Sequence, residues 1–159
     1  MINIENYGWD PKTVGEINHK LMKPPFVRIG DYKIGEKGDI VILLDFRIVQ
    51  PNQKSLKPKL LHSMEHLLLE GLRFYLKDKL INVGPMGCQT GFYITVVNIY
   101  KKDEILSVME KVLNRILEKT EVPYRNVNDC GQAKFHDLTP AQNLAKKLLA
   151  KKDEWAVII

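Results

Sequence analysis

Hydrophobic and polar positions in the first half of the chain show a strand pattern in two segments and then a helical pattern. Residues 26–34 and 40–49 are rich in β-branched and aromatic side chains, and Gly35-Glu36-Lys37-Gly38 between them has the composition of a turn. These segments predict a β-hairpin. Residues 60–76 have the length of a helix and contain no proline, and Pro58 is well placed to open that helix.

The second half of the chain mixes the same two patterns. Residues 92–100 alternate as a strand does, and residues 104–117 repeat apolar side chains with a helical period. A loop is expected at 121–132, and Thr139 then supplies a capping hydroxyl before Pro140, which predicts a last helix to about Ala150. Because strands and helices do not alternate strictly, we expect an α+β fold with a largely antiparallel sheet covered by helices.

Size and composition favour one domain. The chain has 159 residues, 45% of them hydrophobic, which is enough for one substantial core and too few for two. Residues 1–159 are therefore expected to form a single domain. Within it, residues 1–24 contain Gly, Pro and Asn and only weak periodicity, which predicts an irregular N-terminal arm with about one helical turn.

Charge and cysteine content limit the partners and the compartment. The net charge of +5 comes from scattered lysines rather than an arginine-rich arm, so no nucleic-acid partner is expected. No segment approaches the roughly 18 apolar residues of a membrane span, and residues 1–11 lack the apolar core of a signal peptide. We expect a cytoplasmic protein with no membrane partner. Cys88 and Cys130 are not expected to pair there, because that compartment is reducing.

The segment His62-Ser63-Met64-Glu65-His66 is the strongest chemical signal. On a helix, His62 and His66 lie one turn apart on one face, where two imidazoles can hold one metal ion and Glu65 can move protons beside it. The two histidines could instead bond to backbone carbonyls. The carboxylate favours the metal site, because a carboxylate on a buried helix is costly without a cationic partner.

The third ligand of such an ion is left open by the spacing. A catalytic ion commonly takes three protein ligands and keeps one position free for water or substrate. A thiolate together with two imidazoles suits Zn(II) or Fe(II) and disfavours Mg(II) or Ca(II). The candidates for the third ligand are Cys130, Cys88, His136 and His19.

Cys88 and the pair Asp45 and Arg47 are weaker signals. Small residues around Cys88 leave its thiol open, and a nearby cation would make it reactive, although a buried structural cysteine is the simpler explanation. Asp45 and Arg47 are two positions apart on a predicted strand, so they face the same side. They could form a surface ion pair, or Arg47 could orient an anionic or hydroxylated substrate.

Four segments of the chain resemble motifs of the S-ribosylhomocysteine lyase family, also called the LuxS family. They occur in family order and span about residues 26–150, which is far more specific than H-x-x-E-H alone. The segments are Asp45-Phe46-Arg47 with Gln50-Pro51-Asn52, His62-Ser63-Met64-Glu65-His66, Pro85-Met86-Gly87-Cys88-Gln89-Thr90-Gly91-Phe92-Tyr93, and Cys130-Gly131-Gln132-Ala133-Lys134-Phe135-His136-Asp137.

The resemblance implies a LuxS or metallopeptidase-like fold, a homodimer with active sites at the subunit interface, and one divalent ion per subunit. The ion would be Fe(II) in the cell, replaceable by Zn(II) or Co(II), and bound by His62, His66 and Cys130. Glu65 and Cys88 would be the acid–base pair. The family cleaves S-ribosylhomocysteine by carbonyl migration and β-elimination. The products are homocysteine and 4,5-dihydroxypentane-2,3-dione, the precursor of the quorum-sensing signal autoinducer-2.

Substrate contacts also follow from the resemblance, with two departures from the family pattern. Asn82 stands where the family typically has Asp, which would weaken a hydrogen bond to the substrate ammonium. The family serine near the start of the chain has no clear counterpart, and Thr13 is the nearest stand-in. The expected substrate-binding residues are Arg47, Asp45, His19, Arg73, Asn82 and Gly131.

Two other classes of function stay open on the sequence. H-x-x-E-H also marks a class of metallopeptidases, which would need a further acidic ligand and room for a polypeptide. The changed pocket residues would also suit a divergent homologue with another substrate or with no activity.

Overall fold

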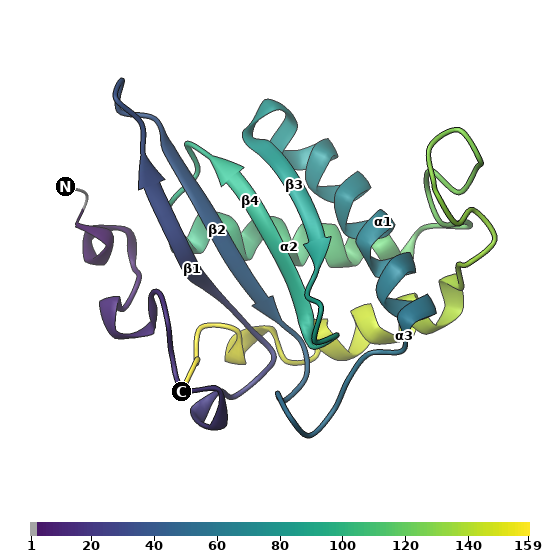
Figure 1. Ribbon diagram of the computed structural model, residues 1–159, viewed down its shortest axis with the longest axis horizontal. Coiled ribbons are helices and arrows are strands. Elements are labelled where there is room, and N and C mark those ends of the chain that lie inside the picture. Colours follow the sequence, from purple (N-terminus) through teal and green to yellow (C-terminus); the bar gives the residue numbers. More distant parts are fainter. Residues whose placement is uncertain (1–2) are drawn as a thin grey trace.

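The computed structural model describes residues 3–159 (Figure 1). Over that range the strands are β1 (Phe26–Ile34), β2 (Ile40–Arg47), β3 (Leu80–Pro85) and β4 (Gly91–Val97), and the helices are α1 (Pro58–Leu76), α2 (Lys102–Leu117) and α3 (Leu138–Leu149). The strands form an antiparallel sheet in the order β1-β2-β4-β3. The predicted α+β architecture is confirmed.

The predicted hairpin is formed by β1 and β2. β1 has the expected bounds, whereas β2 ends at Arg47, because the N–H groups of Ile48 and Val49 turn to the carbonyl of Thr90, 2.9 Å and 3.2 Å away. A bulge between Ile29 and Asp31 shifts the register within the hairpin. As a result, Arg28 lies directly across from Asp45.

β3 is an element that the sequence pattern did not predict. It is a short edge strand with exposed Ile81 and Asn82, so it lacks the apolar alternation of a half-buried strand. Pro85 is its last residue, a position where an edge strand tolerates proline. The following turn, closed by a 2.9 Å bond from the N–H of Met86 to the carbonyl of Gly91, carries Cys88.

β4 is shorter than its predicted segment. It begins at Gly91 and stops at Val97, because Asn98 adopts a left-handed backbone with φ of 53°. The side-chain oxygen of Asn98 also accepts a 2.9 Å bond from the N–H of Ile40 at the start of β2. The polar side chain therefore ends one strand and fixes the start of its neighbour.

The helices follow the predicted order with earlier starts. Pro58 occupies the first turn of α1, as expected. The predicted cap of α3 is wrong, because the helix begins at Leu138 and Asp137 is its N-cap residue, with Thr139 already inside the first turn. The N–H of Asp137 donates to Ser63 Oγ at 2.8 Å, so a contact with α1 sets where α3 begins.

The main core lies between the sheet and the helices, which pack behind the sheet in the view of Figure 1. Alternate residues of the central strands and one face of each long helix supply it. Its most deeply buried members include Ile42, Leu44, Phe46, Phe92, Ile94, Met64, Leu67, Leu68, Leu72, Val112 and Leu113. The other residues of β2, among them Asp45 and Arg47, consequently face the opposite side of the sheet.

The N-terminal arm contains more helix than expected, with short 3₁₀ segments at Ile4–Tyr7, Pro11–Thr13 and His19–Leu21. Buried Trp9 anchors it, because the indole N–H donates to the carbonyl of Tyr100 at 2.6 Å. The C-terminal segment returns to the same side, where the carbonyl of Trp155 accepts a 3.0 Å bond from the N–H of Val27. The N-terminal arm from residue 3 onward and the C-terminal segment therefore both lie beside β1 (Figure 1). None of the helices between residues 3 and 159 combines the length and apolar character required to cross a membrane.

Candidate functional site

Two histidines of α1 and two residues of the loop before α3 converge at one point. His62 and His66 lie one helical turn apart, with ring centroids separated by 4.8 Å. Cys130 Sγ lies 3.4 Å from His62 Nε2 and 3.5 Å from His136 Nε2. The ligand atoms of these four residues all lie within 4.8 Å of one another, so the cluster could hold a metal ion.

Hydrogen bonds on the far side of two rings direct their Nε2 atoms inward. His62 Nδ1 lies 2.9 Å from the carbonyl oxygen of Phe135, and His66 Nδ1 lies 2.8 Å from that of Pro123. A carbonyl oxygen only accepts, so each ring carries its proton on Nδ1 and keeps the Nε2 lone pair for an ion. The sequence-based alternative, histidines bonded to carbonyls, is therefore compatible with metal binding.

Ser63 orients the third ring. Its Oγ donates to the carbonyl of Lys59 at 2.9 Å and lies 3.5 Å from His136 Nδ1. Because the hydroxyl proton is already used, Ser63 accepts from His136 Nδ1–H, and His136 Nε2 faces the cluster. Burial, together with the neighbouring His62 and His66, lowers the pKa of His136 to about 4. This ring is therefore neutral at neutral pH, as a ligand must be.

The spacing and the donor types fit a borderline or soft divalent ion. In a tetrahedral site with bonds of about 2.0 Å to nitrogen and about 2.3 Å to sulfur, ligand atoms stand about 3.3–3.6 Å apart. Both sulfur–nitrogen distances, 3.4 Å and 3.5 Å, fall in that range. The N–H of Gln132 also donates to Cys130 Sγ at 3.4 Å. Zn(II) and Fe(II) suit this donor set.

The structure narrows the choice of the third ligand. Cys130 and His136 join the two histidines of α1, whereas Cys88 and His19 line a separate cavity within the part of the chain that is described. Glu65 lies half-buried on α1, directly before His66. Two expected substrate-binding residues, Arg73 and Gly131, also lie on α1 or beside Cys130.

Arg73 and Gly131 both lie near the cluster of His62, His66, Cys130 and His136. Gly131 directly follows Cys130 and is exposed. Arg73 projects from the last turns of α1, where its guanidinium lies 5.5 Å from the ring centroid of Tyr124. Since Tyr124 follows Pro123, whose carbonyl binds His66, Arg73 is on the same side of α1 as the cluster.

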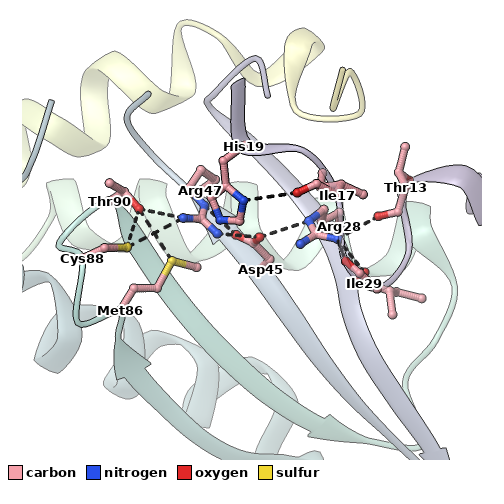
Figure 2. A network of polar contacts seen from close by, with 11 residues as sticks. Thr13, Ile17, His19, Arg28, Ile29, Asp45, Arg47, Met86, Cys88 and Thr90 are labelled. Carbon is pink, nitrogen blue, oxygen red and sulfur yellow. Dashed lines mark hydrogen bonds and ion pairs between the residues drawn. The ribbon is translucent and has the colours of Figure 1, made fainter. Parts of the chain in front are cut away.

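A second group of polar residues lies on the face of the sheet that points away from the helices (Figure 2). Asp45 accepts bonds from Arg28 Nε at 3.0 Å and from Arg47 Nε and Nη2 at 3.1 Å and 2.9 Å. Arg28 Nη1 also donates to the carbonyls of Thr13 and Gly15 in the N-terminal arm. Asp45 is fully buried and Arg47 is 2% exposed, so the two residues do form an ion pair, but it does not lie at the surface. The arm covers this pair, which is why it is buried.

The network ends at Cys88. Arg47 Nη1 donates to Thr90 Oγ1 at 2.7 Å, and Thr90 Oγ1 lies 3.0 Å from Cys88 Sγ. Burial opposes ionisation of the thiol, but the hydrogen bond with Thr90 and the charge of Arg47 outweigh it and lower the pKa of Cys88. Cys88 is exposed and is therefore open to a substrate rather than a buried structural cysteine.

Cys88 faces a cavity of about 410 Å³. His19 from the arm, Thr90 and the loop at residues 51–55 form its other walls. Thr13 does not line this cavity, and its hydroxyl donates to the carbonyl of Asp10 at 2.9 Å. Asn82 lies exposed on β3 opposite Thr95, on the same face of the sheet as Asp45. The cavity thus joins the Cys88 thiol to polar groups from the arm and from the loop at residues 51–55.

Comparison with known proteins identifies the family of this chain. The family model for S-ribosylhomocysteinase (LuxS) matches residues 14–158. The chain belongs to the LuxS family. Relatives named S-ribosylhomocysteine lyase cover nearly the whole chain. The protein of Helicobacter acinonychis (strain Sheeba) is 43% identical over 99% of this chain and 94% of its own length.

Two further LuxS-family relatives carry the same name. The protein of Chromohalobacter salexigens is 42% identical over 97% of this chain and 94% of its own length. That of Macrococcus caseolyticus (strain JCSC5402) is 39% identical over 99% and 92%, respectively. These comparisons do not favour the metallopeptidase alternative, and the cluster contains a cysteine where such an enzyme would need an acidic ligand.

Sequence reasoning did not single out some residues that organise this LuxS-family site. Ser63 was seen only as part of a motif, yet it binds both His136 and the start of α3. Arg28 went unnoticed, because its place beside Asp45 depends on the bulge in β1. Thr90 was likewise named only as part of a motif, although its hydroxyl connects Arg47 to Cys88 by hydrogen bonds. A charged residue in an apolar strand was the one available signal for Arg28.

Proposed function

We propose that this protein is an S-ribosylhomocysteine lyase, which cleaves the thioether of its substrate to release homocysteine. The observation that carries the proposal is the convergence of His62, His66 and Cys130 in a chain that belongs to the LuxS family. Relatives at about 40% identity that cover almost the whole chain bear this enzyme name, which supports the same activity here.

His62, His66 and Cys130 would hold one divalent ion per subunit, with His136 beside them. Fe(II) is the proposed native ion, and Zn(II) or Co(II) could replace it, since all suit two imidazoles and a thiolate. When bound, the ion supplies a Lewis acid that stabilises negative charge developing on the ribose carbonyl oxygen. The four-residue cluster supports this choice of ligands.

Cys88 and Glu65 would move the protons. In each carbonyl shift, a base removes a proton from one ribose carbon, and the neighbouring carbon receives a proton, while the two oxygens exchange one. In the last step, removal of a proton next to the carbonyl leaves an electron pair that expels homocysteine as a thiolate. The other product is 4,5-dihydroxypentane-2,3-dione. The lowered pKa of Cys88 supports its role as a base, because more of the thiol is ionised at neutral pH.

The remaining polar residues would bind the substrate. His19 lines the cavity of Cys88, and Arg47, held in place by Asp45, lies beside it through Thr90, so both could contact the substrate's hydroxyl groups. Arg73 and Gly131 lie near the metal cluster. Asn82 stands on the same face of the sheet as the cavity residues, where it could accept a bond from the substrate ammonium.

A homodimer would bring these two groups of residues together. Within one chain, Cys88 lies in the sheet-side cavity and is not a member of the metal cluster between α1 and the loop before α3. We propose that the cluster of one subunit meets the Cys88 cavity of its partner. The sheet face that carries Asp45 also presents Tyr93, 43% exposed, which supports a partner surface there.

The cellular role follows from the same chemistry. We place the enzyme in the cytoplasm, because two free thiols, one of them a proposed ligand of Fe(II), require a reducing compartment. There the dione would serve as the precursor of autoinducer-2 in quorum sensing, and homocysteine would be recovered.

A thiol-release assay tests the activity. Protein loaded with Fe(II) under anaerobic conditions is mixed with S-ribosylhomocysteine, and free thiol is followed with a chromogenic disulfide. We expect many turnovers per subunit, and Cys88→Ala should lower the rate by about 10²–10⁴-fold, as loss of a general base does. If wild-type protein releases no more thiol than the Cys88→Ala variant, the proposed function is wrong.

A further inference from the structure

The hydroxyl of Thr90 occupies a central position beside Cys88. Thr90 is 3% exposed, so its hydroxyl must find its partners inside the protein. Its Oγ1 lies 2.7 Å from Arg47 Nη1, 3.0 Å from Cys88 Sγ and 3.9 Å from Met86 Sδ. Figure 2 shows these three groups arranged around it.

Counting donors and acceptors leaves two arrangements of these groups. A hydroxyl has one proton and two lone pairs, and a guanidinium only donates, so Arg47 always occupies one lone pair of Thr90. The proton can then point to Cys88 or to Met86, whose thioether only accepts. A Cys88 thiolate accepts this proton. A Cys88 thiol can instead donate its own proton to the second lone pair of Thr90, which turns the hydroxyl toward Met86.

Arg47 makes only a long contact with the Cys88 sulfur, and Asp45 holds its guanidinium in place. Its Nη1 stands 3.9 Å from Cys88 Sγ, while Nε and Nη2 are fixed by Asp45. The shorter path from the guanidinium to the sulfur runs through the Thr90 hydroxyl, by contacts of 2.7 Å and 3.0 Å. Rotation of that hydroxyl moves only a hydrogen atom, so the change of state requires no shift of the buried network.

We propose that Thr90 is a positioning residue for Cys88, whose hydroxyl proton points to the Cys88 thiolate and turns to the Met86 sulfur when Cys88 is protonated. The hydroxyl would thus stabilise both states of the thiol. The consequence for turnover rests on the proposed function. There, the Cys88 thiolate takes a proton from one ribose carbon and returns it to the next, and the Thr90 hydroxyl turns at each transfer.

Other titratable or charged groups lie around the cavity that contains the thiol. They are Arg47 on β2, His19 of the N-terminal arm and Lys54 of the loop at 51–55, which line the same cavity or lie beside it. A comparison that changes Thr90 alone leaves these groups in place. Thr90→Val keeps the shape of the side chain and removes the hydroxyl, whereas Thr90→Ser keeps the hydroxyl and is the matched control.

The test follows alkylation of Cys88 by iodoacetamide as a function of pH, on metal-loaded protein, by mass spectrometry of the Cys88 peptide. We expect Thr90→Val to raise the midpoint of the profile by about one to two pH units, as loss of a hydrogen bond to a charged group does. Thr90→Ser should stay near wild type. Met86→Leu should lower the midpoint slightly, because the thiol state loses the acceptor for the hydroxyl.

An unchanged midpoint in Thr90→Val would overturn the proposal, and so would an equal rise in Thr90→Ser. A raised midpoint in Met86→Leu would overturn the assignment of the second acceptor. Thermal unfolding of each variant identifies a general loss of fold, which would shift both Thr90 variants alike. Alkylation requires no turnover, so wild-type protein with these profiles but without lyase activity would refute the proposed function and leave the role of Thr90 intact.

Discussion

At the scale of single residues, the site depends on how each polar group is held. Asp45 lies between two arginines, so the buried network carries an excess positive charge. The nearest group that can balance it is the thiolate of Cys88, through Thr90. Burying Arg28 and Arg47 thus favours an ionised thiol on the opposite side of Thr90, because an unpaired buried charge is costly.

The two cysteines are expected to respond differently to substitution. Cys130→Ser should weaken metal binding by at least about 100-fold, because a serine hydroxyl is a poor replacement for a thiolate. Cys88→Ala should keep its metal, since Cys88 is outside the cluster. Metal content measured by mass spectrometry after anaerobic loading and gel filtration distinguishes these results. The reverse pattern would show that the two cysteines had been assigned the wrong way round.

At the scale of elements, the ends of β2 and β4 position Arg47 and Thr90 side by side. Gly91, which pairs with Arg47, allows this close approach, since a Cβ there would collide with the carbonyl oxygen of Phe46. Arg47 could then no longer reach Thr90 with the same geometry. The absence of a side chain at one position of β4 therefore brings the guanidinium to the Cys88 turn.

A pair of glycine substitutions tests this role of Gly91. Gly91→Ala should lower the free energy of unfolding by about 1–3 kcal/mol, the usual cost of forcing an atom into a packed interior. Gly87→Ala is the matched control in the same turn, because a Cβ there meets nothing within 4 Å. Urea denaturation measures both. Equal stability of the two variants would mean that β2 and β4 can separate without cost.

At the scale of the whole molecule, the sheet separates two sets of reactive groups. The metal cluster lies by α1 and the loop before α3, while the Cys88 cavity lies toward the arm, on the side of the sheet that the helices leave open (Figures 1 and 2). The proposed homodimer would account for this separation, because its single two-fold interface would place the metal cluster of each subunit against the Cys88 cavity of the other.

Mixing two inactive variants tests the composite site. Glu65→Gln alters the metal half and Cys88→Ala the cavity half, so a mixed dimer has one site with both defects and one site with neither. Random pairing should restore about a quarter of wild-type activity in the thiol-release assay. Each variant alone and a gel-filtration check of the dimer are the controls. If the mixture stays inactive although mixed dimers form, both residues serve a site within one subunit.

Features that depend on nearby residues were predicted from the sequence, whereas features that depend on distant contacts were not. The hairpin, the helices and the histidine spacing depend on neighbours within a few residues, so periodicity and turn composition were sufficient for them. β3 was not predicted, because an exposed edge strand needs no alternation of apolar residues. The start of α3 was predicted wrongly, because it is set by a hydrogen bond from the N–H of Asp137 to Ser63, which is distant in the sequence.

The sequence by itself determined the fold class, the helix that carries His62 and His66, and, through its motifs, the identity of the chemistry. The tertiary structure decided which residues meet. It placed His136 with Cys130 at the metal cluster, and it placed Arg28 rather than Ile29 beside Asp45 through a one-residue bulge. It also placed the cationic side chain of Arg47 near Cys88, with the Thr90 hydroxyl bonded to both. These contacts join segments distant in sequence, so they depend on register, loop path and packing, which local patterns do not encode.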